Sequence, residues 1–365
     1  MTCFRLSLVG LALLAVSGCR TAGLLSAVDY RADKPVRNVI FVVGDGMGLA
    51  QITAGMYARD NTSVFEQFPV VGLIKTHSSD QLITDSAAGA TAFSCGQKTY
   101  NGAIAVDSNR LPLRTIFEEG DERGYGTGVV VSSTITHATP AAFYAHDESR
   151  NNYEAIAEDL VLSGVDVGIG YGKEQFSART DARDLLAILN ERGFQVQDNL
   201  EAFDVRKHER QMVLLPGVDP PRANERPKDF LSRGAILAAD QLKANREPFL
   251  LVVEGSQIDW AGHANDTEYL IGEMLDFEVA LESLIRWAEK DGETLVVVTA
   301  DHETGGLALT DGDLDQFSVV GSYSTKNHTA VMVPVFAFGP AATLFSGMYD
   351  NTAIYTKLRM ALGWE

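Results

Sequence analysis

The sequence predicts an α/β fold with a mostly parallel central sheet flanked by helices on both faces. Apolar runs rich in valine and isoleucine recur along the chain, and their continuous apolar character is typical of strands buried on both sides. Helix-like segments lie between these runs, and this alternation favours a sheet that helices cover. The strand-like runs are residues 38–43, 126–131, 249–253, 294–299 and 331–338, and the helix-like segments are residues 49–59, 113–123, 153–163, 181–192, 230–245 and 267–290.

The composition is that of an ordinary globular protein. The chain is 45% apolar, 22% charged and 8% aromatic, which excludes a disordered, collagenous or coiled-coil protein. Its formal net charge is −19, so the surface should repel polyanions, and we expect no nucleic-acid binding site. An anionic substrate would therefore need a locally positive site.

The N-terminus has the features of an export signal. Arg5 precedes an apolar run, and small residues then lead to Cys19, so residues 1–18 are predicted to be a signal peptide. The residues before Cys19 resemble the cleavage box of bacterial lipoproteins, in which the cysteine is lipidated and becomes the new N-terminus. We therefore expect residues 19–35 to form a lipidated tether and the protein to be exported to the periplasm, attached to a membrane only through Cys19. Simple cleavage nearby is the alternative.

Residues 36–365 are predicted to form one domain. The least regular stretch, residues 199–227, contains several prolines and charged residues and is interpreted as an excursion over the surface. Acylation of Cys19 would leave Cys95 without an intrachain partner, so stability would come from core burial, with metals as a further source.

Polar side chains follow several of the predicted strands. Asp45 follows the first strand, Glu254 follows residues 249–253, and Asp301 and His302 follow residues 294–299. In open α/β sheets, chemistry gathers at the carboxyl ends of the strands. Asp301 and His302 follow a buried strand, so an ordinary solvent-exposed position does not readily explain these two metal donors. The Asp-Gly pair at Asp45, by contrast, could equally mark a turn.

Three further side chains are candidate metal ligands. Asp259 and His263 are four residues apart, so a helical turn would direct both towards one cation. Carboxylate and imidazole are ordinary zinc donors. The alternative for this pair is a capping aspartate with a surface histidine. His328 precedes the last predicted strand and, taken alone, is typical of a loop histidine.

Ser86 is the candidate nucleophile. Asp85 or Ser86 could begin a helix of small residues, whose free backbone N–H groups and dipole would favour an anion. The alternative is a serine that only caps the helix. No Gly-x-Ser-x-Gly elbow surrounds Ser86, so its hydroxyl would need another source of activation, such as direct metal coordination.

Together these motifs resemble those of bacterial alkaline phosphatases over most of the chain after Val36. Six separated motifs occur in one order, which leaves little room for coincidence. The matching stretches are residues 44–48, 84–88, 137–150, 254–263, 301–306 and 328–329.

The resemblance implies an alkaline-phosphatase-like catalytic domain, a metal-dependent hydrolase of small-molecule phosphate monoesters with a phosphoserine intermediate on Ser86. It further implies that Arg150 grips the phosphate and that the site holds two zinc ions and one magnesium-type ion. It also admits a homodimer, since dimers are common in the family. The implied ligands are Asp259, His263 and His328 for one zinc, Asp45, Asp301 and His302 for the second zinc, and Asp45, Thr139 and Glu254 for the third ion.

Such a site is chemically sensible in its own right. Two divalent ions can stabilise both the attacking and the leaving oxygen of an in-line displacement, and arginine can hold two phosphate oxygens at once. The ions and Arg150 would outweigh the four carboxylates, which makes the site positive inside an acidic protein. We hypothesise that zinc-bound Ser86 attacks phosphorus while the other zinc stabilises the leaving alkoxide, and that water then hydrolyses the phosphoserine.

Two residues depart from the most familiar pattern of the family. His137 stands where some relatives have aspartate, and we favour a hydrogen-bonding role for it outside the ligand shell. Alternatively, His137 alters the metal preference of the third site, because imidazole suits zinc better than magnesium. Trp260 stands where some relatives have lysine; it either borders the substrate pocket and contacts the leaving group or simply packs.

Two other functions stay open. A phosphodiesterase of the same superfamily would share the two-zinc core, although Arg150 with Thr139 and Glu254 favours monoesters. A surface lipoprotein that binds phosphate or zinc without turnover would explain the metal donors but would give Ser86 and Arg150 no joint purpose.

Overall fold

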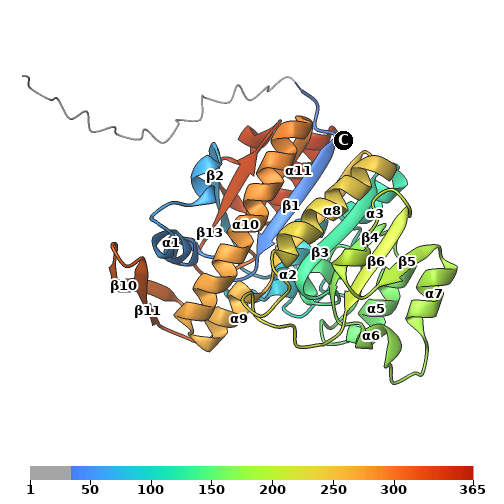
Figure 1. Cartoon of the computed structure of the whole chain (residues 1–365), viewed down its shortest axis with the longest axis horizontal. Helices are drawn as coiled ribbons and strands as arrows, with labels where there is room; N and C mark the ends of the chain where they lie inside the picture. The colour runs from blue at the N-terminus through green and yellow to red at the C-terminus, as the bar shows by residue number, and fades with distance from the viewer. Residues whose placement is uncertain (1–33, 365) are drawn as a thin grey trace, which may run out of the picture.

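A computed structural model describes residues 34–364 of the chain and confirms the predicted fold class. One ten-stranded sheet, mostly parallel, runs through the molecule, with helices on both faces (Figure 1). The strands follow one another across the sheet in the order β14 (Gly347–Asp350), β2 (Val70–Lys75), β13 (Val333–Phe338), β8 (Thr294–Thr299), β1 (Asn38–Gly44), β7 (Phe249–Gly255), β3 (Gly126–Thr134), β4 (Val167–Tyr171), β6 (Arg210–Leu215) and β5 (Phe194–Gln197).

The register of the three central strands places their carboxyl ends at one edge of the sheet. β1 lies between β7 and β8, and both neighbours run parallel to it. Val43 of β1 is level with Glu254 on one side and with Thr299 on the other. Among the described strands of this sheet, only β13 runs antiparallel to its neighbours. The polar residues that follow β1, β7 and β8 therefore meet at this edge.

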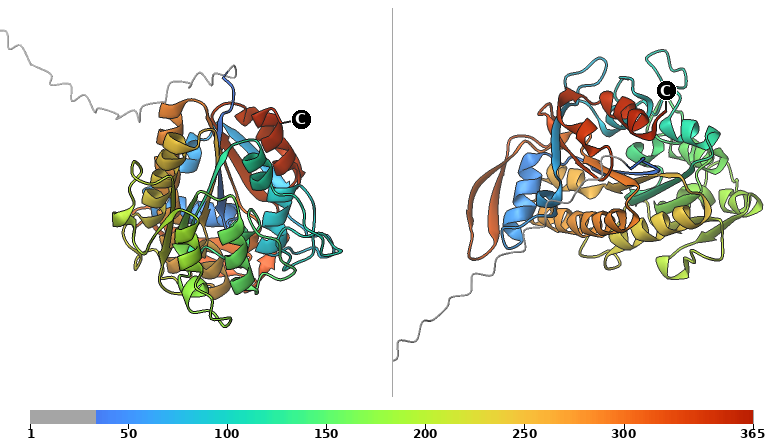
Figure 2. Two further views of the ribbon diagram at one scale, coloured as in Figure 1. Left: turned by 90° about the vertical axis from the view of Figure 1, so that its right-hand side faces the viewer. Right: turned by 90° about the horizontal axis from the view of Figure 1, so that it is seen from above.

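Helices cover the sheet in two layers, which the side views of Figure 2 separate. On one face α8 packs against β3, β7 and β4, and α10 packs against β8 and β7. On the other face α3 packs against β3 and β7, and α11 packs against α2. The helices are α1 (Leu49–Ala58), α2 (Ser86–Cys95), α3 (Ile116–Glu122), α4 (Ala138–Ala141), α5 (Tyr153–Leu162), α6 (Glu174–Ser177), α7 (Leu185–Glu191), α8 (Phe230–Asn245), α9 (Gln257–Ala264), α10 (Thr267–Asp291) and α11 (Ala353–Leu362).

Local capping decides where several predicted helices begin and end. Thr115 and Glu118 form a capping box at the start of α3, so this helix begins three residues later than predicted. Asp184 caps α7 without such a box, and its side chain accepts from the backbone N–H groups of Leu186 and Ala187. Gly292 ends α10 in the left-handed conformation, which glycine adopts without steric cost.

Large apolar side chains fill the space between the sheet and both helical layers. Phe41 of β1 is buried and packs against Phe93 and Phe143, with ring centroids 5.4 and 6.0 Å away. On the other face Phe277 of α10 is fully buried against Gly255, where a Cβ atom would lie 2.5 Å from the phenyl ring. Gly255 follows Glu254 in β7, so this close contact fixes the strand end that carries Glu254.

The interpretation of residues 199–227 as a surface excursion is wrong in part. This stretch contains β6, which lies between β4 and β5 in the central sheet and is buried along most of its length. Its apolar run is short and is flanked by charged residues and prolines, so the flanks obscured it. The sequence prediction also omitted β2, β4, β5 and β14, as well as the hairpin of β10 (Leu307–Asp313) and β11 (Ser318–Tyr323).

Several expectations concern the N-terminus. The predicted signal peptide, Cys19 and most of the predicted tether lie outside the described residues. Within residues 34–364 no helix is long and apolar enough to cross a bilayer.

Cys95 is buried and forms no disulfide, and burial raises the pKa of its thiol to about 12. This thiol is therefore unreactive at neutral pH.

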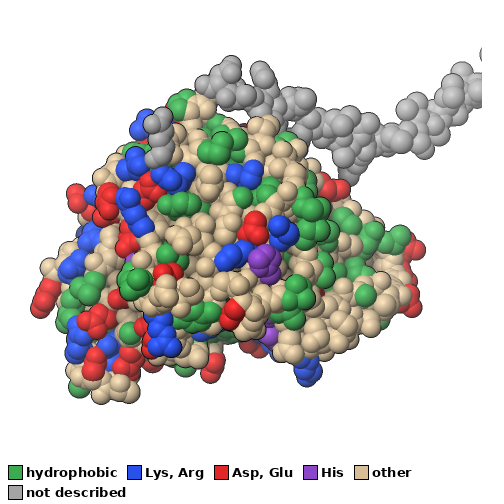
Figure 3. All heavy atoms as spheres, turned by 180° about the vertical axis from the view of Figure 1, so that it is seen from behind, with side chains coloured by type: hydrophobic (Ala, Val, Ile, Leu, Met, Phe, Trp, Pro, Cys, Tyr) green, Lys and Arg blue, Asp and Glu red, His purple; other side chains and the backbone are tan. Residues whose placement is uncertain are grey.

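The exposed surface mixes charge types on the face seen in Figure 3, where lysine and arginine side chains lie among acidic and apolar ones. Over the whole chain acidic side chains outnumber basic ones, with a formal net charge of −19, so the surface as a whole does not attract anions. Attraction for an anionic substrate must then come from the site itself.

Truncation of Phe277 tests the contact between α10 and the end of β7. We expect Phe277→Ala to lower the free energy of unfolding by about 3–5 kcal/mol, because it leaves a cavity under the central sheet. Urea unfolding followed by circular dichroism would measure the change. Leu314→Ala is the matched control, since Leu314 is 62% exposed and should change stability little. Equal effects of the two substitutions would contradict this description of the core.

Candidate functional site

The polar residues at the carboxyl edge of the central strands form one buried cluster. Asp45, Glu254, Asp301 and His302 each have no exposed surface. One oxygen of each carboxylate accepts no hydrogen bond from the described residues, namely Asp45 Oδ1, Glu254 Oε1 and Asp301 Oδ2. Buried carboxylates without a partner are costly, so these oxygens fit ligands of cations.

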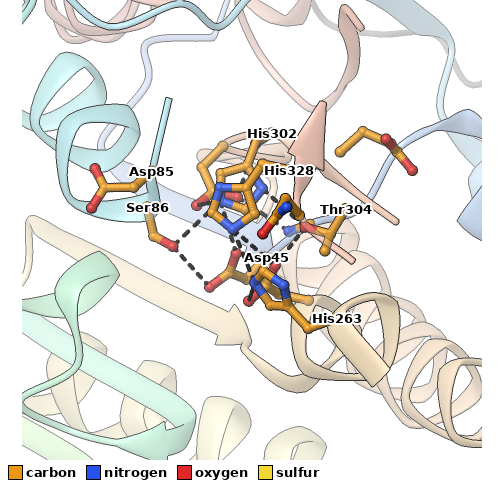
Figure 4. Close-up of polar contacts among 12 residues, drawn as sticks. Asp45, Asp85, Ser86, His263, His302, Thr304 and His328 are labelled. Atoms are coloured by element: carbon orange, nitrogen blue, oxygen red, sulfur yellow. Dashed lines mark hydrogen bonds and ion pairs between the residues drawn. The ribbon is translucent and has the colours of Figure 1, made fainter. Parts of the chain in front are cut away.

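The first group of candidate ligands comprises Asp259, His263 and His328, which are in mutual contact. His263 Nε2 lies 3.3 Å from Asp259 Oδ2 and 3.1 Å from His328 Nε2, while His328 Nε2 lies 3.4 Å from Asp259 Oδ1. The predicted helical turn exists as α9, which carries the first two residues on one face. His328 lies on β12 (His328–Thr329), a short strand paired with β9 (Glu303–Thr304). The structure thus brings all three together. Figure 4 labels His263 and His328 of this group.

The second group surrounds Ser86. His302 Nε2 lies 3.2 Å from Asp301 Oδ2 and 3.6 Å from Asp45 Oδ1. Ser86 Oγ lies 3.4 Å from His302 Nε2 and donates to Asp45 Oδ2 at 3.5 Å, as the dashed lines in Figure 4 mark. The rings of His302 and His328 stack at a centroid distance of 3.5 Å, so the second group adjoins the first.

A third group of candidate ligands also includes Asp45. Donor atoms of Asp45, His137 and Glu254 come within 4.8 Å of one another. Thr139 Oγ1 and His137 Nδ1 are buried and make no hydrogen bond with the described residues. His137 Nε2 also lies 3.4 Å from Arg150 Nη2, so this histidine is close to both a ligand set and the arginine. Both interpretations of His137 therefore remain compatible with its position.

Asp85 connects the nucleophile to the arginine, a role that sequence reasoning missed. Its Oδ1 accepts from the backbone N–H of Ala88 and caps α2, whose first residue is Ser86. Its Oδ2 accepts from Gly102 N and from Arg150 Nη1, both at 3.0 Å. Its position next to Ser86 was the only sequence signal for a role of Asp85 in the site. The contact with Arg150 could not be predicted from it, because the two residues are 65 positions apart in the sequence.

Thr304 and Gly46 also support the site, and of these two residues sequence reasoning gave no role to Thr304. The Thr304 hydroxyl contacts the Asp259 carboxylate and lies 3.2 Å from His302 Nδ1. Gly46 has a φ of +73°, and a Cβ atom there would lie 2.7 Å from the Cα atom of Asp259. Only glycine lets the loop after β1 approach α9 this closely.

Trp260 borders a cavity instead of only packing. Its side chain lines an opening of about 780 Å³ that begins beside His137. The two rings meet edge to face, with centroids 6.1 Å apart. Of the two interpretations of Trp260, its position favours the one beside the substrate pocket.

Burial shifts the pKa values of the cluster in opposite directions. It raises the pKa of Asp45 well above its usual range and those of Glu254 and Asp301 to about 7 and about 6. Burial holds the pKa of His302 well below its usual range and lowers that of His137 to about 3. These histidines are thus neutral, and neutral imidazoles beside unpartnered carboxylate oxygens are the donor set that zinc requires.

Asp259 behaves differently from the other carboxylates. Burial opposes its ionisation, but hydrogen bonds with His263 and His328 outweigh this effect and lower its pKa well below the usual value. The pKa of His263 rises to about 9 for the corresponding reason, its hydrogen bond with Asp259. A cation bound here would displace the protons that these histidines otherwise hold.

The sequence matches the family model of alkaline phosphatase over residues 36–321. It is 34% identical to alkaline phosphatase 3 of Bacillus subtilis over 90% of each chain, and 30% identical to the alkaline phosphatase of Escherichia coli over 95% of this chain and 90% of that one. The fold matches the alkaline phosphatase of the Antarctic bacterium TAB5 with a TM-score of 0.87 and 42% identity, covering 91% of this chain and 100% of that one. A histidine-to-aspartate variant of the TAB5 enzyme, with Mg bound in its M3 site, matches with the same TM-score.

The metal-free protein should lose stability as the pH rises from about 6.5 to about 9. Asp301 and Glu254 have higher pKa values in the folded chain than in an unfolded one, so their stabilising contribution is present at low pH and lost as they ionise. His263, with a folded pKa of about 9, acts in the same direction. Below about pH 6.5 the slope becomes shallower, because buried neutral His302 and His137 bind protons only after unfolding and so offset part of the carboxyl contribution.

Thermal unfolding of chelator-treated protein across this pH range measures the effect. For each proton by which the folded and unfolded states differ, the free energy of unfolding changes by about 1.4 kcal/mol per pH unit. Glu254→Gln should flatten the dependence of stability on pH near pH 7, because glutamine does not titrate whereas Glu254 has a pKa of about 7. Metal-free protein that became more stable between these pH values would contradict the raised carboxyl pKa values.

Proposed function

Since the chain belongs to the alkaline phosphatase family and is a phosphate monoester hydrolase of that superfamily, we propose that it acts through a phosphoserine on Ser86, with two zinc ions and one magnesium-type ion. The observation that carries the proposal is the contact of Ser86 Oγ with Asp45 and His302 inside a cluster of buried metal donors.

The donor sets support the proposed ions. Asp259, His263 and His328 would hold one zinc, and Asp45, Asp301 and His302 would hold the other. The side chains of Asp45, Glu254 and Thr139 offer only oxygen atoms, which suit magnesium. When bound, such ions supply Lewis-acid stabilisation of the attacking and leaving oxygens.

Ser86 and Arg150 have complementary roles in the proposed reaction. Ser86 Oγ attacks phosphorus, a Ser86–phosphorus bond forms, and the bond from phosphorus to the ester oxygen breaks, which releases the alcohol after it gains a proton. Water then attacks the phosphoserine, releases inorganic phosphate and returns the serine hydroxyl. Arg150 holds two phosphate oxygens through its planar guanidinium, and its contact with Asp85, the residue before Ser86, keeps it beside the start of α2.

A phosphodiesterase of the same superfamily is the second candidate. A monoester carries a further non-bridging oxygen, and Arg150 beside the group of Asp45, His137 and Glu254 offers that oxygen a positive environment once the third ion is bound. A diester has an alkyl group at this position instead. The monoester is therefore the better match.

We also propose that the protein is exported to the periplasm and anchored through a lipid on Cys19, as a monomer or a homodimer. The lipoprotein-like signal before Cys19 supports the anchor. The buried free thiol of Cys95 fits a secreted chain whose stability does not depend on a disulfide.

Replacement of the nucleophile tests the mechanism. We expect Ser86→Ala to lower kcat on p-nitrophenyl phosphate roughly a thousandfold or more, because it removes the proposed nucleophile, the hydroxyl that contacts Asp45 and His302. Acid quenching of the unmodified enzyme during turnover, followed by peptide mass spectrometry, should find phosphate on Ser86. Ser94→Ala is the control, since Ser94 is buried on the same helix and bonds only to its neighbours.

Full activity of Ser86→Ala, or no phosphate on Ser86 after the quench, would overturn the phosphoserine. Assays with and without a chelator report on the metal requirement. Faster cleavage of bis(p-nitrophenyl) phosphate than of the monoester would instead favour the phosphodiesterase.

Replacement of His137 tests the third site. We expect His137→Asp to raise magnesium binding to about one ion per chain, because magnesium prefers oxygen ligands to imidazole. The TAB5 histidine-to-aspartate variant with Mg in its M3 site is a precedent in a relative. Metal content after dialysis against zinc and magnesium gives the measure, with His77→Asp, a solvent-accessible position, as control. Unchanged magnesium content would mean that His137 lies outside the ligand shell.

A further inference from the structure

A cavity of about 780 Å³ opens directly beside the catalytic groups. It shares His137 with the third donor group, and its Trp260 follows Asp259 in α9. Arg150 contacts His137 at 3.4 Å and precedes the cavity residue Asn151 in the chain. Cavities of this size hold small organic molecules. The organic part of an ester whose phosphate lies between Ser86 and Arg150 therefore has this cavity next to it.

All charged side chains that line the cavity are carboxylates. They are Glu154 of α5, Glu174 of α6 and Asp219, and neither lysine nor arginine is among the described lining residues. Asp219 is exposed and makes no side-chain hydrogen bond or ion pair with the described residues. The carboxylate of Glu174 accepts only from the backbone N–H of Gly217 at 2.9 Å.

Two basic residues that adjoin lining residues in the chain, Lys173 and Arg179, are already engaged. Lys173 lies 3.4 Å from Asp198 in an ion pair. Arg179 forms an ion pair with Asp181 and donates to the backbone carbonyls of Glu154 and Gln175. Glu154 itself accepts from the backbone and the hydroxyl of Thr180. None of these contacts brings a cation to Asp219 or Glu174. The wall of the cavity therefore keeps its negative charge.

Aromatic side chains complete the wall. Trp260 and Tyr153 line the cavity and are half-buried, so each offers part of its ring to an occupant. Aromatic faces next to carboxylates are the combination that recognises organic ammonium groups, through cation–π attraction and direct charge attraction.

We propose that this cavity is a leaving-group subsite that selects phosphate monoesters whose alcohol carries an ammonium group. The inference rests on the proposed phosphomonoesterase activity and adds the substrate class. A cationic leaving group meets Glu174, Asp219 and the rings of Trp260 and Tyr153, while its dianionic phosphate meets Arg150. A leaving group with a carboxylate is repelled by the same wall.

Three aryl phosphates built on the same phenol separate the effect of leaving-group charge from the effect of leaving-group reactivity. They are phosphotyramine, which carries an ammonium group, 4-ethylphenyl phosphate, which is neutral, and 3-(4-phosphonooxyphenyl)propionate, which carries a carboxylate. We expect kcat/KM, measured as phosphate release by zinc- and magnesium-loaded enzyme at low salt, to fall in that order. The cationic ester should exceed the neutral one by about tenfold, and high salt should reduce this ratio.

Two double variants identify the charges responsible. Asp219→Asn with Glu174→Gln removes charge from the cavity wall and keeps an acceptor for Gly217 N. Asp315→Asn with Glu289→Gln removes the same charge from exposed positions outside the cavity. The first variant should bring the ratio of cationic to neutral kcat/KM within about twofold of unity, whereas the second should leave it near its original value.

Equal kcat/KM for the three esters in the unmodified enzyme would overturn the subsite alone. So would equal loss of the ratio in both double variants, because the preference would then come from the overall charge of the protein. Absence of hydrolysis of all three esters would overturn the proposed activity, and the subsite with it.

Discussion

The structure depends on one electrostatic constraint, the burial of several carboxylates and imidazoles at a single edge of the sheet. Asp45, Glu254 and Asp301 have no exposed surface, and one oxygen of each lacks a hydrogen bond from the described chain. Isolated buried carboxylates are stable only when protonated or paired with positive charge. Bound divalent ions would satisfy this constraint, and the same ions could then polarise a phosphate ester.

The arrangement of the sheet explains why these groups meet. The parallel register of β1 with β7 and β8 brings three strand ends level, although they lie far apart in the sequence. The short pairing of β12 with β9 adds His328 beside His302. Close contacts of Gly46 with the backbone of α9 and of Gly255 with the Phe277 ring then fix the loop after β1 and the end of β7 beside the cluster. The apolar core thus acts on function indirectly, by holding polar groups where they would not gather in solution.

Much of this could be predicted from local sequence patterns. Continuous apolar runs identified the central strands, and the four-residue spacing of Asp259 and His263 predicted the helical turn that carries both. The remainder depends on contacts between distant segments. The link from Asp85 to Arg150 and the support of Thr304 for Asp259 leave no pattern in a single sequence. β6 was missed because its apolar run is short and lies among charges and prolines, and the carboxylate-lined cavity forms only when α5, α6 and α9 come together.

The most direct test of the central claim is an anomalous diffraction experiment on crystals of the protein grown with zinc and magnesium. The account predicts two zinc peaks, one among Asp259, His263 and His328 and one among Asp45, Asp301 and His302 within reach of Ser86 Oγ. A folded, phosphatase-active crystal form with no metal at either position would contradict it.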